Sequence, residues 1–248
     1  KAHLLDLISH RTSGTGSTRQ RRINPPRLLF EAFLVLIGIG ACLLKLPAAT
    51  VGSVTWMEAA FTATSAVTVT GLIVVDTGSQ FTLFGQGVLL ILIQLGGLGL
   101  MTFAVLTAMA LGFRLGVQQR LSSREAFNEI SLYTTGRAGG SIALFALSAE
   151  AFGMVLLGLF FVPELGWSEG LYQALFYSIS AFNNSGFALS PDSLSAHVDH
   201  TGINLSVSIL FILGGLGYIV VMELVNKRSW SRLSVYAKVI LIATLLLN

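Results

Sequence analysis

The hydrophobic residues of the chain are gathered into blocks, and short polar or charged segments separate these blocks. One block without any Lys, Arg, Asp or Glu runs from Phe81 to Phe113, well beyond the roughly 20 residues that a helix needs to cross a bilayer. The pattern predicts four full spans and the start of a fifth near residue 234; the four cover residues 28–46, 82–112, 141–162 and 202–225. Such a pattern is typical of an all-α integral membrane protein.

Two shorter apolar stretches, near residues 55–66 and 169–182, lie between the predicted spans. Each has about ten to fourteen residues, which is too few for a full crossing but suits a re-entrant half-helix. A half-helix is tolerated at membrane depth only where protein or water covers the ends of its backbone. We therefore predict two half-helices that enter the membrane and return to the same side.

The charged residues give the orientation of these segments. Only 11% of the residues are charged and the mean hydropathy is +0.76, which excludes an ordinary soluble domain. Basic residues cluster before the first span, after the second and after the fourth, where the positive-inside rule predicts cytoplasm: Arg11, Arg19, Arg21, Arg22, Arg27, Arg114, Arg120, Arg124, Arg137, Lys227, Arg228, Arg232 and Lys238. The N-terminus is then cytoplasmic. The outer side carries Lys45 and these acidic residues: Glu58, Asp76, Glu164, Glu169, Asp192 and Asp199.

The chain contains an internal repeat of about 115 residues. FTATSAVTVTGL at Phe61–Leu72 aligns without gaps on FYSISAFNNSGF at Phe176–Phe187, and LGGLG occurs at both Leu95–Gly99 and Leu213–Gly217. Each unit is predicted to be a span, a half-helix, a glycine-bearing loop and a second span, in the same orientation. Parallel repeats are related by rotation about the membrane normal, so their half-helices and loops can surround a central cation pore.

The loop after each half-helix carries the candidate ion-binding residues, which are Thr68, Val69, Thr70 and Gly71 in the first unit and Asn183, Asn184, Ser185 and Gly186 in the second. Glycine permits backbone conformations closed to other residues, and backbone carbonyls can replace the hydration shell of potassium. The negative ends of the half-helix dipoles would also favour a cation there. No carboxylate lies between Glu58 and Asp76, which favours a filter of carbonyls over a ring of acidic side chains.

The repeat and the charges divide the chain into five predicted segments. These are a basic cytoplasmic tail (1–27), a first pore repeat (28–112), a cytoplasmic loop (113–140), a second pore repeat (141–226), and a cytoplasmic turn with the start of a third repeat (227–248). Because the first residue is Lys1 and the last apolar run stops at Asn248 after about ten residues, we expect the sequence to continue.

These motifs resemble the Trk/Ktr/HKT superfamily of potassium uptake proteins, and the resemblance extends over roughly residues 28–226. Its most specific pieces are SAVTVTGL at Ser65–Leu72 and ILIQLGGLGLMTF at Ile91–Phe103. A basic tail that leads directly into the first span looks most like the Ktr-type membrane subunit. The resemblance implies four units around one pore, so the remaining filter glycines and the gating loop are expected beyond Asn248, although two copies meeting around a pore is the alternative.

The resemblance also implies partners and a location. K⁺ would be the transported ion, and Na⁺ would stimulate its uptake. The membrane subunit would form a homodimer in the bacterial inner membrane and dock on a cytosolic, KtrA-like nucleotide-binding regulatory ring. Membrane lipid is the further partner expected, especially for the basic tail. No nucleic-acid partner and no transition-metal site are expected.

Other residues have more than one interpretation. Glu150, midway along a predicted span, is either functional or a hydrogen-bond partner of a neighbouring helix. His197 and His200 flank Asp199, but solvated loop residues are more common than a metal site. The glycines of the two LGGLG segments are expected to serve helix packing: Gly96, Gly97, Gly99, Gly214, Gly215 and Gly217.

Three other functions compete with a potassium pore. An ion-coupled secondary carrier of another monovalent cation also uses broken helices, although carriers usually show inverted repeats. A membrane scaffold that conducts nothing would not need two half-helices ending in glycine loops. An intramembrane enzyme is disfavoured because no HExxH, no GxSxG and no Asp pair occurs within the predicted spans.

Overall fold

The computed structural model of the chain describes residues 25–110 and 132–247. The described residues form long helices and half-helices joined by loops, with an isolated bridge between Thr50 and Phe81. In chain order the elements are α2 (Pro25–Leu44), α3 (Trp56–Val67), α4 (Thr77–Gln80), α5 (Leu83–Ala110), α6 (Leu132–Leu165), α7 (Trp167–Phe182), η1 (Ser195–His197), α8 (Thr201–Lys227), η2 (Trp230–Arg232) and α9 (Val235–Leu247). The prediction of an all-α membrane fold is confirmed.

Every predicted span corresponds to a helix. Three helical stretches of the described residues are long and apolar enough to cross a membrane, namely Leu83–Ala104, Gly139–Leu165 and Thr201–Lys227. The apolar part of α2, Leu29–Leu44, and α9 are shorter. Large apolar side chains such as Leu144 and Val155 on α6 are about two-thirds exposed, as expected of a face in contact with lipid.

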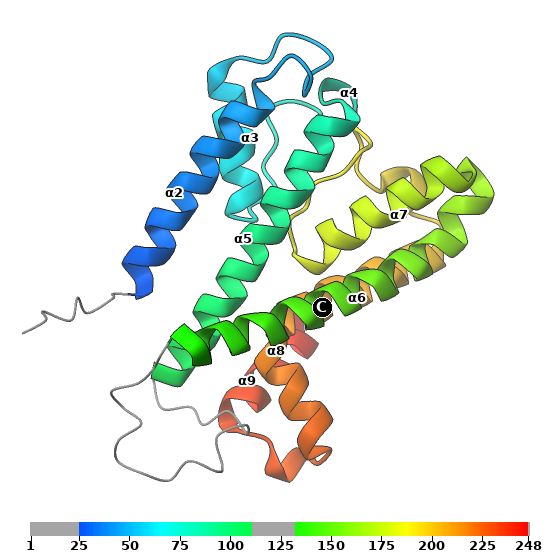
Figure 1. The fold of residues 1–248 in the computed structure, drawn as a ribbon. Coiled ribbons are helices and arrows are strands. Elements are labelled where there is room, and N and C mark those ends of the chain that lie inside the picture. The colour runs from blue at the N-terminus through cyan, green and yellow to red at the C-terminus, as the bar shows by residue number, and fades with distance from the viewer. Residues whose placement is uncertain (1–24, 111–131, 248) are drawn as a thin grey trace, which may run out of the picture.

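The two short apolar stretches form α3 and α7, which are half-helices packed inside their own units. In Figure 1, α3 lies beside α2 and α5, while α7 runs back along α6 and also contacts α8. Helix α3 begins with a capping box, because the Thr55 side chain accepts a hydrogen bond from the Glu58 amide and the Glu58 carboxylate accepts one from the Thr55 amide. Protein therefore covers one face of each half-helix, while Met57 of α3 and Trp167 of α7 remain exposed on the other.

The units share part of their cores. The core around α3 includes Ala63, Leu89 and Ile93, and it also takes in Phe176 and Phe187 from the second unit. A second core surrounds α7 and contains Phe161 and Leu210. Because two buried phenylalanines of one unit pack in the core of the other, the units are joined by apolar packing as well as by the chain.

The helix boundaries differ from the prediction in the segment between the units. Residues 113–140 were predicted as a loop, but α6 already begins at Leu132; residues 111–131 lie outside the described part of the chain. A helix can extend past the apolar region because its backbone hydrogen bonds stay satisfied within the helix, whatever the polarity of its side chains. Hydropathy therefore predicts the apolar part of α6 but not its first turns.

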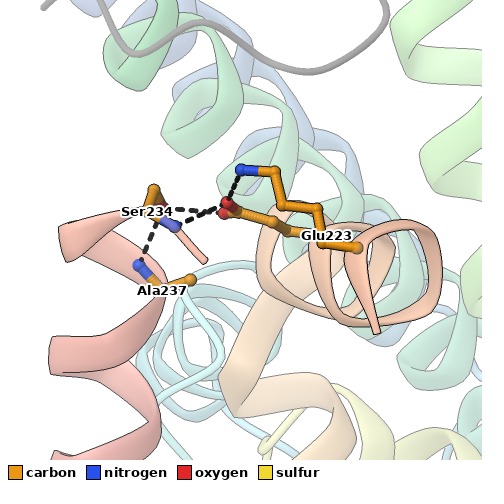
Figure 2. Close-up of polar contacts among 4 residues, drawn as sticks. Glu223, Ser234 and Ala237 are labelled. Carbon is orange, nitrogen blue, oxygen red and sulfur yellow. Dashed lines mark hydrogen bonds and ion pairs between the residues drawn. The ribbon is translucent and has the colours of Figure 1, made fainter. Parts of the chain in front are cut away.

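The turn between α8 and α9 is held by a carboxylate (Figure 2). Glu223 Oε1 accepts a hydrogen bond of 2.7 Å from the Ser234 amide and pairs with Lys227, while Glu223 Oε2 accepts one of 2.7 Å from Ser234 Oγ. Ser234 Oγ in turn accepts from the Ala237 amide at 3.1 Å and so caps the first turn of α9. These bonds fix the start of α9 against the end of α8.

Candidate functional site

The loops that follow α3 and α7 have the same backbone conformation. The φ angles of Val69 and Gly71 are 54° and 75°, and those of the aligned Asn184 and Gly186 are 58° and 74°. The left-handed region costs a β-branched residue such as valine about 1–2 kcal/mol, so the surrounding structure must impose this conformation. The two units therefore share one loop conformation after their half-helices.

Backbone hydrogen bonds tie each loop to the helix before it in the same way. The Thr68 and Thr70 amides donate to the Thr64 and Ser65 carbonyls, both at 2.9 Å. In the second loop the Asn183 and Ser185 amides donate to the Ile179 and Ser180 carbonyls, at 3.1 and 2.9 Å. Within the described residues, no hydrogen bond reaches the carbonyl oxygens of residues 68–71 or 183–186. These oxygens remain available to a cation.

The two loops touch each other at their glycines. A Cβ atom placed on Gly71 would lie 2.3 Å from the Ser185 carbonyl oxygen and 3.2 Å from the Gly186 Cα. A Cβ on Gly186 would lie 3.5 Å from the Gly71 Cα. All eight residues predicted to bind the ion therefore belong to two adjoining loops, and Gly71 is required both by its φ angle and by the approach of the second loop.

Hydroxyl groups support the loops differently in the two units. In the first loop Thr68 Oγ1 and Thr70 Oγ1 share a hydrogen bond of 2.6 Å. In the second, Ser180 Oγ donates 2.6 Å to the Phe187 carbonyl and lies 2.9 Å from Ser185 Oγ. Ser65, which aligns with Ser180, is buried with no hydrogen-bond partner for its hydroxyl among the described residues. The backbone pattern is thus repeated although the side chains behind it are not.

The LGGLG glycines let the following helix reach the end of each half-helix. A Cβ on Gly96 would lie 2.1 Å from the Val67 carbonyl oxygen, and one on Gly214 would lie 1.7 Å from that of Phe182. Gly97 and Gly99 likewise face Asn183 and the Phe33 ring. The packing role predicted for these four glycines is confirmed.

The other two glycines of the second segment make no such contact among the described residues, so their packing role stays a prediction. A Cβ on Gly215 or on Gly217 would meet no atom of residues 25–110 and 132–247 within 4 Å. Gly217 instead has φ 71° and ψ 160°, which interrupts α8. Only glycine adopts this conformation readily, so Gly217 interrupts the helix.

Glu150 reaches the second loop from α6. It is 4% exposed, and its Oε1 accepts a hydrogen bond of 3.0 Å from Asn183 Nδ2, which also lies 3.2 Å from Gln94 Oε1 on α5. The Glu150 carbonyl oxygen accepts a further bond of 2.7 Å from Ser178 Oγ. Of the two interpretations of Glu150, the hydrogen bond to a neighbouring helix is therefore present. The contact of Gln94 with Asn183 was not predicted from the sequence, because this contact depends on packing between the units.

The two histidines of the loop before α8 have structural contacts. His200 Nδ1 accepts a hydrogen bond of 3.4 Å from the Ile203 amide at the start of α8, and its ring packs edge-on against Phe160. The His197 ring packs against Phe161. No group of three or more metal-ligating side chains occurs in residues 25–110 and 132–247.

Membrane-length helices around paired half-helices, each ending in a loop with free carbonyls, define a membrane protein of the transporter and channel class. Residues 20–242 match the TrkH family, described as cation transport protein, and the chain belongs to this family. The predicted membership of the Trk/Ktr/HKT superfamily is confirmed. The family is one of transport proteins, which agrees with the prediction that the chain is not an enzyme.

Several curated proteins are similar to the chain. It is 45% identical over 227 residues to Ktr system potassium uptake protein B of Bacillus subtilis, and this match covers 92% of the chain and 51% of that protein. It is 43% identical over 226 residues to the protein of the same name from Vibrio alginolyticus, covering 90% of the chain and 49% of that protein. Potassium/sodium uptake protein NtpJ of Enterococcus hirae is 34% identical over 230 residues, 92% of the chain and 51% of its own length. The chain spans about half the length of these relatives.

Proposed function

We propose that the protein takes up potassium across the membrane through a selectivity filter of backbone carbonyls from residues 68–71 and 183–186. The observation that carries this proposal is the repeated left-handed loop, whose carbonyl oxygens accept no hydrogen bond from the described part of the chain. A dehydrated K⁺ needs a cage of oxygens to replace its water, and carbonyl dipoles provide one without the charge of carboxylates. The names of the relatives, potassium uptake protein B and potassium/sodium uptake protein, support the choice of ion.

The helices support the cation electrostatically. Both α3 and α7 end directly before a loop, and the contact of Gly71 with Ser185 and Gly186 brings these two helix ends together. The C-terminal end of a helix carries the equivalent of about half a negative charge. Two such ends directed at one place favour a cation and disfavour an anion.

The outer flanks of the two loops are open and would receive further filter loops. A hollow beside the second loop is lined by Tyr177, Asn184, Gly186 and Phe211. Another, beside the first loop, is lined by Met57, Thr64, Thr68 and Thr70. Two loops surround only part of an ion, so we propose that equivalent loops, from further units or from a second copy, complete the ring.

The wider assembly is part of the same proposal. The clusters of Lys and Arg favour a cytoplasmic N-terminus in a bacterial inner membrane. Two relatives are named as parts of a Ktr system, which supports an assembly of several components. We propose that this assembly is a homodimer docked on a cytosolic nucleotide-binding ring. One relative is named a potassium/sodium uptake protein, and Na⁺ is the ion we propose to stimulate uptake. Pull-down of the complete gene product from bacterial membranes tests the assembly.

The filter is tested by substituting its glycines. Gly71→Ser and Gly186→Ser force a side chain into a left-handed position, and Gly71→Ser also collides with the Ser185 carbonyl. Strain of about 1–3 kcal/mol at the filter corresponds to a loss of roughly tenfold or more in preference for K⁺ over Na⁺. The measurement is rubidium, potassium and sodium uptake by the complete gene product in cells that lack other potassium uptake systems.

Gly87→Ser is the matched control. Gly87 lies in α5, has no positive φ, and a Cβ there would meet nothing within 4 Å. This variant is expected to transport like the unmodified protein. Unchanged uptake and unchanged preference for potassium in both filter variants, at equal abundance in the membrane, would show that the filter lies elsewhere.

A further inference from the structure

A polar cluster joins the second loop to both units. Asn183 begins this loop and is 6% exposed, and its side-chain Nδ2 has three acceptors: Glu150 Oε1 at 3.0 Å, Gln94 Oε1 at 3.2 Å and the Ile179 carbonyl at 3.0 Å. Glu150 belongs to α6 of the second unit, whereas Gln94 belongs to α5 of the first. The residue before the strained Asn184 is thus held from two helices of different units.

The cluster breaks the symmetry between the units. Gly40 and Gly153 occupy equivalent places, because a Cβ on Gly40 would meet Leu92 and Ala63 while one on Gly153 would meet the corresponding Leu210 and Ser178. This equivalence places Ile37 at the position of Glu150, and the alignment of the loops places Thr68 at that of Asn183. Ile37 packs against the apolar core of the first unit. The first loop therefore has no counterpart of this side-chain link.

The position of Gln94 shows the same asymmetry. The alignment of the two LGGLG segments places Ile212 of α8 at the equivalent of Gln94. The Gln94 amide of α5 therefore faces the second loop, whereas the corresponding residue of α8, Ile212, is apolar. The polar link belongs specifically to the junction between the first and second units.

Burial of the Glu150 carboxylate is unfavourable, which suggests that this side chain has a function. Moving an acidic side chain into a buried site within a membrane costs several kcal/mol, and an apolar residue such as the Ile37 of the first unit avoids this cost. Glu150 and Gln94 accept hydrogen bonds from Asn183 Nδ2 and so favour one rotamer of Asn183, although Asn183 Oδ1 and Gln94 Nε2 are buried without a partner among the described residues. The Asn183 side chain in turn restrains the backbone from which the second loop starts.

We propose that Glu150 is a positioning residue for cation selection, which acts together with Gln94 through Asn183 to hold the second loop in register with the first. The proposal rests on the filter function proposed above. Glu150 acts by accepting a hydrogen bond, so an uncharged acceptor of the same length is sufficient at this position.

The test compares substitutions at Glu150 and Gln94 in the complete gene product, in cells without other potassium uptake systems. Glu150→Leu and Gln94→Leu are each expected to lower the preference for K⁺ over Na⁺ by roughly five- to tenfold, the effect of losing one hydrogen bond. Glu150→Gln keeps an acceptor oxygen and should stay within about twofold of the unmodified protein. The double variant with both leucines should be no worse than the worse single variant, because both act on one side chain.

A control and a second measurement separate positioning from folding. Ser148→Leu introduces a leucine on the exposed face of α6, where the Ser148 side chain bonds only within its own helix, and should leave selectivity unchanged. Abundance in the membrane and the apparent affinity for K⁺ are measured for every variant. If Glu150→Leu does not reach the membrane, the half-buried Gln94 decides the question through Gln94→Leu.

Each outcome bears on the proposal. Leucine variants at normal abundance with unchanged selectivity would overturn it, and so would a Glu150→Gln variant as damaged as Glu150→Leu, since the charge would then be what matters. If the glycine variants lose selectivity and the leucine variants keep it, only the positioning role is wrong. If Gly71→Ser and Gly186→Ser keep selectivity, the filter proposal itself fails.

Discussion

A valine in the left-handed region is an unusual residue choice, and Val69 has a φ angle of 54°. The aligned residue of the second loop is Asn184, whose short polar side chain tolerates this region far better. Asn184 also donates hydrogen bonds of 3.3 Å to the Phe182 and Phe211 carbonyls. At the scale of single residues, the two loops share one conformation but not one level of strain.

The difference predicts the effect of exchanging these residues. Val69→Asn should raise the free energy of unfolding by about 1 kcal/mol, because asparagine relieves the steric cost. Asn184→Val should lower it by about as much or more, since it adds strain and removes two hydrogen bonds. Thermal unfolding of the purified protein in detergent measures both, and a lower melting temperature for Val69→Asn would contradict this account.

At the scale of elements, each half-helix has a defined beginning and end. The capping box starts α3 at Thr55, and a left-handed residue stops each half-helix at its loop. Helix α7 starts differently, after Gly166 with φ 83° and without a side-chain cap. The start of α3 therefore depends on the ionised Glu58, whereas that of α7 depends on glycine.

The capping box predicts a pH dependence at the start of α3. Hydrogen bonds from the Thr55 amide and hydroxyl, followed by the charge of Lys45, hold the pKa of Glu58 below its usual value of 4.5. A lowered pKa means that the folded state prefers the ionised form, so this stability is present above the usual pKa and is lost as the pH falls through the lowered one. Glu58→Gln should therefore be less stable than the unmodified protein at pH 7.

The melting temperatures of the two proteins are compared across the acid range. Their difference should shrink as the pH falls below the usual pKa of Glu58, because protonation removes the advantage of the carboxylate. The exposed Glu31, which pairs with Arg27 on α2, gives a matched control through Glu31→Gln. A difference at Glu58 that does not change with pH would mean that ionisation is not involved.

At the scale of the whole molecule, the sequence predicted the plan of the units and missed the contacts between them. The half-helices followed from apolar stretches too short to span and from charges that must stay on one side, both of which are local properties. Gln94 and Asn183 are 89 residues apart in the chain, and only packing of the units brings them together. The two identical LGGLG segments show the same limit, since α5 continues through Gly99 whereas α8 breaks at Gly217.

The two units are further joined beside the start of α5. The Tyr172 hydroxyl of α7 donates a hydrogen bond of 2.6 Å to Gln86 Oε1, and Gln86 Nε2 donates 2.9 Å to the Phe81 carbonyl. Gln86 is 6% exposed, so its oxygen has no ready substitute for the tyrosine. A Cβ on Gly78 would lie 1.8 Å from the Leu189 carbonyl oxygen, which shows how closely the units approach here.

Tyr172→Phe removes this bond while keeping the ring, and it should lower the free energy of unfolding by about 1–2 kcal/mol. Burial, with a smaller contribution from the charge of Glu169, raises the pKa of Tyr172 from its ordinary value of 10.0 to about 12. The hydroxyl then keeps its proton in the folded and unfolded states well below pH 10, so the loss should be constant from about pH 6 to 9. Tyr218→Phe on α8 serves as the comparison, because the Tyr218 ring packs on Phe145 and no hydrogen bond of its hydroxyl occurs among the described residues. Thermal unfolding at several pH values checks the prediction, and a loss that fades between about pH 7 and 9 would mean that the hydroxyl ionises there and that burial at the junction is weaker than the contacts indicate.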